Sequence, residues 1–288
     1  MKCVKVPRRL MEKVRVKRAP GYEVLYEGDF ALIPVSEVSE GLEVVECNPP
    51  LRRETPRLNE IVPGISSFYI VGDIMVISPK RELTQKEIEK IMATYNRVNA
   101  IYLRRKVTGE LRVNELVHLA GERRTTTTFS EGGLKYFVDL AKVYVNPSLA
   151  TERLKIVDSI PQGSRVLDAF TGYGALALQL ARKLGYIVAG DLNLDGLMMA
   201  SKSAKLNSSK LVLDLVHFDA HNLPFRDKAF DLAIGDNPTM IDEFVDELCR
   251  VSSSVILYKL GRIQEGWEKV NDYSKDLVIM KRVLRCDE

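Results

Sequence analysis

The sequence predicts an α/β protein in which a doubly wound parallel sheet forms the C-terminal domain and two smaller α+β domains precede it. Three observations support this fold class. Residues 164–191 follow the order strand, glycine turn, helix, strand and acid, which is one βαβ unit. Strand and helix patterns then alternate to the end of the chain. Four strands end on an acid, namely Asp168, Asp191, Asp219 and Asp236. We expect domains at 1–56, 57–155 and 156–288.

The glycine turn indicates which ligand the first βαβ unit binds. A dinucleotide fingerprint would place a third glycine or an alanine in the helix and aim the helix N-terminus at a pyrophosphate. Here an alanine, Ala177, stands at that position of the helix. An aspartate opens the turn, however, which gives Asp168-x-Phe170-x-Gly172-x-Gly174. This pattern is typical of class I S-adenosylmethionine-dependent methyltransferases, which have a Rossmann-like fold. An ordinary βαβ turn is the alternative.

Ligands of doubly wound sheets bind beyond the carboxyl ends of the strands, where the four acids fall. We expect Asp168 and the two glycines to contact the methionine end of S-adenosylmethionine. Asp191 would bind the ribose hydroxyls, and Asp219 would lie near the adenine. The predicted cofactor-binding residues are Asp168, Phe170, Gly172, Gly174, Asp191, Leu192, Asp219, Ala220 and Asn237.

The other elements follow from periodicity. In the C-terminal domain, helices are expected at 175–184, 195–206 and 241–251. Strands are expected at 186–190, 211–218, 230–235 and 254–260, with 277–284 as an edge strand. The second domain should contain strands within 68–77 and at 101–107, 111–116, 125–129 and 134–140, and a helix at 85–99 that begins with the capping box Thr84-x-x-Glu87. The first should contain a basic helix at 9–17, strands at 22–26, 30–35 and 43–46, and a connector at 49–56.

Charge is unevenly distributed along the chain. Residues 1–155 carry 26 Lys or Arg and 20 Asp or Glu, whereas residues 156–288 carry 16 and 19. A basic front part suits a polyanionic substrate, and ordinary surface charge is the alternative. No apolar run of about 18 residues and no signal peptide is present, so we expect a cytoplasmic protein without a membrane span.

The four cysteines and three histidines show no ligand spacing. We therefore expect neither a structural zinc nor a disulfide framework, and no metal at the site. His217 and His221 are interpreted as incidental. The chain is expected to be a monomer.

The block Arg104–Arg153 resembles the equivalent block of the archaeal and eukaryotic class I tRNA (guanine-N1)-methyltransferases, which act at position 37 beside the anticodon. The stretch Val138–Tyr144, followed by Ala150–Arg153, is its most specific part. The aminocarboxypropyl transferases of wybutosine synthesis share the block. The resemblance covers nearly the whole chain and implies that tRNA is the partner and substrate.

The resemblance also implies roles for single residues. Glu152 matches the family's general base and Arg112 the arginine that recognises guanine, whereas Tyr144 and Arg153 fall on other positions of the active region. Guanine N1 carries a proton and becomes nucleophilic when a carboxylate removes it, which shifts negative charge to O6 where a guanidinium can stabilise it. Without the resemblance, Glu152 and Arg153 would be interpreted as a helix N-terminus capped by Thr151 or Ser148.

The motif after the fourth strand, Asp236-Asn237-Pro238-Thr239, should face the reacting group. We expect Asp236 to be catalytic and Asn237 and Pro238 to contact the substrate. Asp236 replaces the asparagine of the family, and Ser148 replaces one of its arginines. A second carboxylate near Glu152 could change which group serves as the base.

Three alternatives remain open at this stage. The enzyme could transfer the aminocarboxypropyl group of the wybutosine pathway, or it could methylate another or a pre-modified guanine. A third alternative is an RNA-binding module that keeps the fold without catalysis, although such a module has no need for Glu152, Asp191 and Asp219 together.

Overall fold

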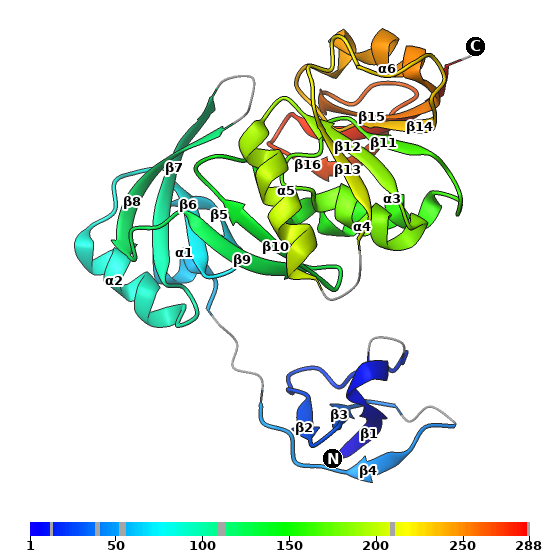
Figure 1. Cartoon of the computed structure of the whole chain (residues 1–288). Helices are drawn as coiled ribbons and strands as arrows, with labels where there is room; N and C mark the ends of the chain where they lie inside the picture. Colours follow the sequence, from blue (N-terminus) through cyan, green and yellow to red (C-terminus); the bar gives the residue numbers. More distant parts are fainter. Residues whose placement is uncertain (12–13, 38–40, 52–55, 109–112, 208–210, 287–288) are drawn as a thin grey trace. The chain divides into compact units, whose positions relative to one another are not determined.

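The computed structural model describes residues 1–288 except 12–13, 38–40, 52–55, 109–112, 208–210 and 287–288. The chain divides into two compact units, residues 1–57 and residues 58–288 (Figure 1). The predicted division into domains at 1–56, 57–155 and 156–288 stays a prediction.

The first unit contains an antiparallel sheet in the order β2-β3-β1-β4. Its strands are β1 (Lys2–Pro7), β2 (Leu25–Glu27), β3 (Phe30–Pro34) and β4 (Val44–Glu46). The alternating residues Val4, Val6, Ala31 and Ile33 form its core. The predicted basic helix at 9–17 is wrong: residues 2–7 form a strand, a short 3-10 helix η1 (Arg8–Leu10) follows, and residues 14–17 have no regular structure. The apolar residues at positions 4 and 6 alternate with lysines, and this period of two selects the strand.

The second unit begins with a four-stranded sheet in the order β5-β6-β7-β8. Its elements are α1 (Leu58–Ile61), β5 (Ile65–Val71), β6 (Ile74–Pro79), α2 (Gln85–Thr94), β7 (Ala100–Thr108) and β8 (Val113–Gly121). The chain turns back at residues 72 and 73, as predicted, so β5 and β6 form a hairpin. The predicted capping box at Thr84 is confirmed, but α2 ends at Thr94 and is shorter than expected.

A separate hairpin of β9 (Thr126–Glu131) and β10 (Leu134–Asp139) packs on two helices that follow it in the chain, α4 (Ala175–Leu184) and α5 (Leu194–Leu206) (Figure 1). Tyr136 is completely buried in this contact and belongs to one hydrophobic cluster with Tyr173, Leu178 and Met199. The hairpin therefore reaches the glycine turn through its aromatic side chains.

The largest sheet has seven strands in the order β13-β12-β11-β14-β15-β17-β16. They are β11 (Val166–Asp168), β12 (Ile187–Asp191), β13 (Leu213–His217), β14 (Phe230–Gly235), β15 (Ser252–Gly261), β16 (Glu268–Asp272) and β17 (Val278–Arg285). The first five strands in this order are parallel, and β17 and β16 are antiparallel to their neighbours. The prediction that residues 277–284 form the edge strand is wrong, because β16 pairs outside β17. The charged, weakly alternating sequence of β16 concealed this strand.

Helices cover both faces of this sheet. Helix α3 (Ala150–Ser159) and α4 pack on the face that carries Val166, Ile234 and Ile256, and α6 (Val245–Val251) packs on the opposite face. The predicted helix at 241–251 is divided into a 3-10 turn η3 (Ile241–Glu243) and α6. The doubly wound arrangement is therefore confirmed.

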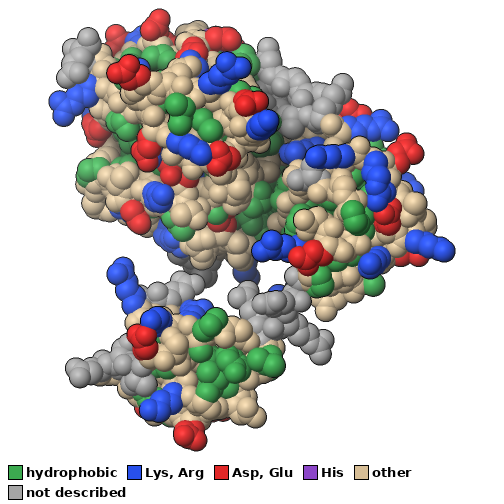
Figure 2. Space-filling view, turned by 180° about the vertical axis from the view of Figure 1, so that it is seen from behind, with side chains coloured by type: hydrophobic (Ala, Val, Ile, Leu, Met, Phe, Trp, Pro, Cys, Tyr) green, Lys and Arg blue, Asp and Glu red, His purple; other side chains and the backbone are tan. Residues whose placement is uncertain are grey.

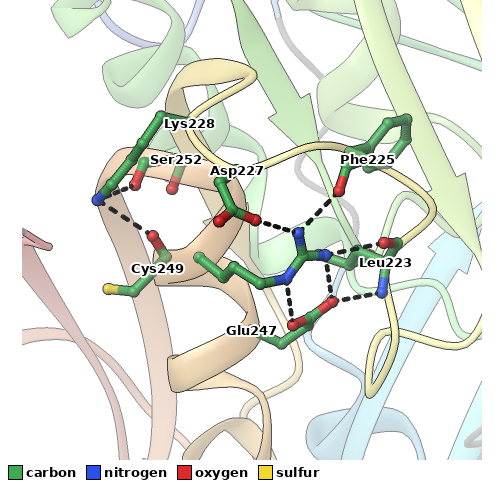
Figure 3. A network of polar contacts seen from close by, with 8 residues as sticks. Leu223, Phe225, Asp227, Lys228, Glu247, Cys249 and Ser252 are labelled. Atoms are coloured by element: carbon green, nitrogen blue, oxygen red, sulfur yellow. Dashed lines mark hydrogen bonds and ion pairs between the residues drawn. The ribbon is translucent and has the colours of Figure 1, made fainter.

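The loop between β13 and β14 is fixed to α6 by Arg250 (Figure 3). The Arg250 guanidinium donates to the carbonyl oxygens of Leu223 and Phe225 and forms ion pairs with Asp227 and Glu247. Glu247 in turn accepts from the backbone N–H of Leu223 at 2.7 Å. This network holds the segment that follows Asp219.

Two disulfides are present, Cys3–Cys47 and Cys249–Cys286. The prediction that there is no disulfide framework is therefore wrong. The sheet register brings distant cysteines together: Cys3 lies opposite Val45 on β4, and the backbone N–H of Cys286 donates to Ser253 next to α6. Spacing along the chain contains no information about such pairs.

Charged side chains of both signs are interspersed on the faces visible in Figure 2. In the residues that the structure describes, no helix is long and apolar enough to cross a membrane.

Candidate active site

The carboxyl ends of β11, β12, β13 and β14 surround one cavity of about 250 Å³. The four predicted acids, at 168, 191, 219 and 236, all line it. Of the other predicted cofactor-binding residues, Phe170, Gly172, Leu192, Ala220 and Asn237 line it as well. Gly174 is absent from the lining. The structure therefore brings together nearly the whole predicted cofactor group.

The two glycines of the turn have different structural roles. Both adopt positive φ, 51° at Gly172 and 86° at Gly174. A Cβ on Gly174 would lie 2.6 Å from Leu178 and 2.9 Å from Ala200, whereas a Cβ on Gly172 would meet nothing within 4 Å. Gly174 thus permits close packing of the turn against α4 and α5, and Gly172 leaves space at the cavity wall.

Asp191 supports the turn as well as lining the cavity. Its Oδ2 accepts from the backbone N–H of Gly172 at 2.7 Å, and its Oδ1 accepts from that of Asn193 at 2.8 Å. Burial raises the pKa of Asp191, and these backbone hydrogen bonds oppose the shift. The acid that ends β12 therefore fixes the glycine turn of the preceding loop.

Asp168 is the most deeply buried of the four acids, with 1% of its surface exposed. Its Oδ2 has no hydrogen-bond partner among the described residues, nor does the hydroxyl of Tyr173, which lines the same cavity. Burial, together with the charges of Asp236 and Asp191, raises the pKa of Asp168 to about 7. A buried carboxylate oxygen without a hydrogen-bond partner is suited to bind a cationic group of a ligand.

Asp219 is held by a histidine at the other end of the cavity. Its Oδ1 accepts from the backbone N–H of His221 at 2.9 Å and contacts the ring Nδ1 at 2.7 Å. These hydrogen bonds lower the pKa of Asp219, and the partnership with Asp219 and Glu243 raises that of His221. The ring of His221 lies 4.5 Å from that of Phe244. His221 was interpreted as incidental, but it lines the cavity.

The segment before α3 forms another wall of the cavity. The predicted substrate residues Tyr144, Arg153 and Pro238 line it with Asn237. The guanidinium of Arg153 makes two hydrogen bonds to the carboxylate of Glu131, at 2.7 and 2.6 Å, and both side chains are more than nine-tenths buried. Arg153 is thereby tied to the end of β9.

The predicted base, Glu152, lies in the first turn of α3. It is 9% exposed and is absent from the cavity lining. Its Oε1 accepts from the hydroxyl of Tyr258 at 3.0 Å and from Lys281 Nζ at 2.8 Å. The alternative interpretation correctly placed Glu152 and Arg153 at a helix N-terminus, but its capping residues are wrong, because Leu149 is at the N-cap and no side chain caps the helix. Arg112 lies outside the described residues.

Several residues near the site were missed by sequence reasoning, namely Asn146, Tyr173, His221, Tyr258, Tyr273 and Lys281. Tyr173 lies between the two motif glycines, which is a signal that could have been used. The others lie on strands or loops whose position relative to the cavity could not be predicted from the sequence. The described residues contain no group of three or more His, Cys, Asp or Glu side chains that could hold a metal.

The fold and the acidic cavity rim define a class I S-adenosylmethionine-dependent methyltransferase. The model of the TRM5/TYW2 methyltransferase domain matches residues 127–286. The chain is 35% identical to tRNA (guanine(37)-N(1))-methyltransferase Trm5b of Pyrococcus abyssi, over 97% of this chain and 91% of that protein. The protein therefore belongs to the TRM5/TYW2 methyltransferase family.

Solved structures agree with this membership. The crystal structure of Trm5b from Pyrococcus abyssi superposes with a TM-score of 0.70, at 26% identity over 99% of both chains. A structure of aTrm5 in complex with tRNALeu superposes with the same TM-score of 0.70, at 22% identity over 99% of both chains, and supports the fold.

Proposed function

We propose that this protein is a tRNA methyltransferase that modifies N1 of guanosine 37, beside the anticodon. One observation carries the proposal: the acidic strand ends and the segment with Tyr144 and Arg153 line a single cavity. The similarity to Trm5b of Pyrococcus abyssi over nearly the whole chain supports the choice of substrate. The related structure that contains tRNALeu supports tRNA as the partner.

The residues of the cavity fit S-adenosylmethionine. The carboxylate of Asp168 has an unpartnered oxygen suited to an α-amino group, Gly172 leaves room beside the turn, and Asp191 and Asp219 provide acceptors for ribose and adenine donors. When bound, S-adenosylmethionine supplies a methyl group on an electrophilic sulfonium centre.

The protein's own residues would prepare the guanine. Glu152 is proposed to accept the N1 proton, Arg112 to stabilise the charge that develops on O6, and Asp236 to accept hydrogen bonds from the base edge. Asp236 lines the cavity and contributes to raising the pKa of its neighbours Asp168 and Tyr258. Tyr144, Arg153, Asn237 and Pro238 are proposed to hold the substrate.

The test is to incubate the protein with an unmodified tRNA transcript and S-adenosylmethionine, digest the tRNA and weigh the nucleosides. The proposal expects a gain of one methyl on guanosine, which a transcript with adenosine at position 37 should abolish. A gain of an aminocarboxypropyl group would replace the proposed reaction with that of the wybutosine pathway. Methylation that persists on the altered transcript would move the reaction to another nucleotide.

A further inference from the structure

The partners of Glu152 come from two neighbouring strands. Tyr258 on β15 and Lys281 on β17 are directly opposite each other in the antiparallel register. Cross-strand partners have side chains on the same face of the sheet, so their polar ends converge. Both meet on Oε1 of Glu152, at 3.0 and 2.8 Å. We call this pair the Tyr258–Lys281 clamp.

The clamp lies immediately behind the wall of the cavity. Two residues away along the same strands, Leu260 and Ile279 are also directly opposite each other, and both line the cavity. Because side chains alternate with a period of two, the two pairs share one face and are about 7 Å apart along the strands. On the helix side, Leu149 lines the cavity, and Glu152 follows it by three residues on the same face. Glu152 therefore lies next to the residues of the cavity wall, both along the helix, from Leu149, and along the strands, from the pair Leu260 and Ile279.

The carboxylate of Glu152 and the ammonium of Lys281 form an ion pair that is shielded from solvent. The side chain of Glu152 is 10% exposed and that of Lys281 16%. Burial lowers the pKa of Lys281, but the carboxylates of Glu152 and Glu268 outweigh it, so the net pKa is raised. Lys281 therefore stays charged. Burial, together with the charges of Asp236 and Glu152, raises the pKa of Tyr258, which keeps its hydroxyl as a donor.

We propose that Tyr258 and Lys281 are positioning residues that hold Oε1 of Glu152 and fix the orientation of this carboxylate as the proton acceptor. The inference rests on the proposed function, in which Glu152 takes the N1 proton. Among the described residues, no hydrogen bond to Oε2 is found, so the second oxygen remains for that proton. The charged and titratable groups around Glu152 are Lys281 and Tyr258, with Glu268 beyond the lysine and Asp236 beyond the tyrosine.

The experiment measures single-turnover formation of N1-methylguanosine on a tRNA transcript at saturating S-adenosylmethionine. Lys281→Met should lower the rate constant by roughly tenfold to a hundredfold. Lys281→Arg should restore the wild-type rate, because it supplies a charged donor to the same oxygen. Lys269→Met is the matched control, since Lys269 lies on β16 and pairs with Asp272.

Tyr258→Phe removes one hydroxyl and keeps the packing, so it tests the clamp if Lys281→Met does not fold. It should slow the reaction by roughly threefold to tenfold with unchanged S-adenosylmethionine binding. A Lys281→Met enzyme with the wild-type rate would overturn the clamp, as would a Lys281→Arg enzyme that is as slow as Lys281→Met. Glu152→Gln separates the two levels: wild-type turnover in that variant would overturn the proposed role of Glu152 itself, whereas slow turnover beside a normal Lys281→Met overturns only the clamp.

Discussion

The cofactor rim and the first turn of α3 are both built around buried carboxylates, but they are held by contacts of different range. Asp191 bonds to the backbone of Gly172, 19 residues away, and to that of Asn193. Glu152, in contrast, is held by residues 106 and 129 positions further along the chain. The rim is thus defined by adjacent βα units, whereas the position of α3 depends on the order of distant strands.

In α3, therefore, the side chains that stabilise the position of the helix are also those proposed to take part in the reaction. On the rim, backbone donors, glycines and the carboxylate of Asp191 set the geometry, so a change at the other rim side chains mainly affects the ligand. At α3, two charged residues in sequence are paired with different elements, Glu152 with β15 and β17 and Arg153 with β9. A change there should affect stability and turnover together.

The largest effect should come from Glu131→Gln. This change leaves the guanidinium of Arg153 buried without its carboxylate, which costs about 3–5 kcal/mol when a buried pair is broken. Urea unfolding measures it. Glu122→Gln is the matched control, because Glu122 pairs with Arg124 while 58% exposed and should cost less than about 1 kcal/mol. Equal losses in the two variants would show that the Arg153 pair does not hold α3.

The next largest effect concerns turnover. Glu152→Gln and Arg112→Ala should each slow single-turnover methyl transfer by at least about a hundredfold. The first variant loses the proton acceptor, and the second loses the guanidinium that stabilises the charge on O6. Binding of S-adenosylmethionine, measured by calorimetry, should stay as in the wild type. Wild-type rates in both variants would contradict the proposed roles of Glu152 and Arg112.

The same contrast explains what could be predicted from sequence. The glycine turn, the four acids and the alternation of strands with helices follow from local periodicity and from the rule that ligands bind beyond the carboxyl ends of parallel strands. Lys281 belongs to a strand that was predicted to be an edge, and β16 was missed. Neither the clamp nor the Cys249–Cys286 disulfide could be predicted, because both depend on how β17 pairs.

A smaller effect separates the two glycines of the rim. Gly174→Ala should destabilise the fold by about 1–3 kcal/mol, because its Cβ would collide with Leu178 and Ala200. Gly172→Ala meets open space, so it should cost about 1 kcal/mol from its positive φ and mainly weaken S-adenosylmethionine binding. Thermal unfolding and calorimetry of both variants test this. Equal affinities in Gly172→Ala and the wild type would place the ligand away from the turn.

The smallest effect is a pH dependence at Asp168, where burial raises the pKa from 3.8 to about 7. The folded protein binds this proton more tightly than the unfolded chain does. The resulting stabilisation is complete below the ordinary pKa of an aspartate and is lost as the pH rises through about 7. A cationic ligand group favours the ionised form, so affinity for S-adenosylmethionine should fall by up to about tenfold for each pH unit below that point. The ligand's α-amino group has a pKa of about 8, so only the acidic side of the affinity profile reports the titration of Asp168.

Calorimetric titrations on the two sides of this pKa measure the slope. Asp168→Asn, which has nearly the same shape, should bind weakly and lose the acidic limb, and its stability should exceed that of the wild type at alkaline pH because no charge is buried. An acidic limb that persists in Asp168→Asn would assign the proton to Asp191, whose pKa is also raised by burial. Asp191, which fixes the glycine turn, would then recognise the cation in place of Asp168.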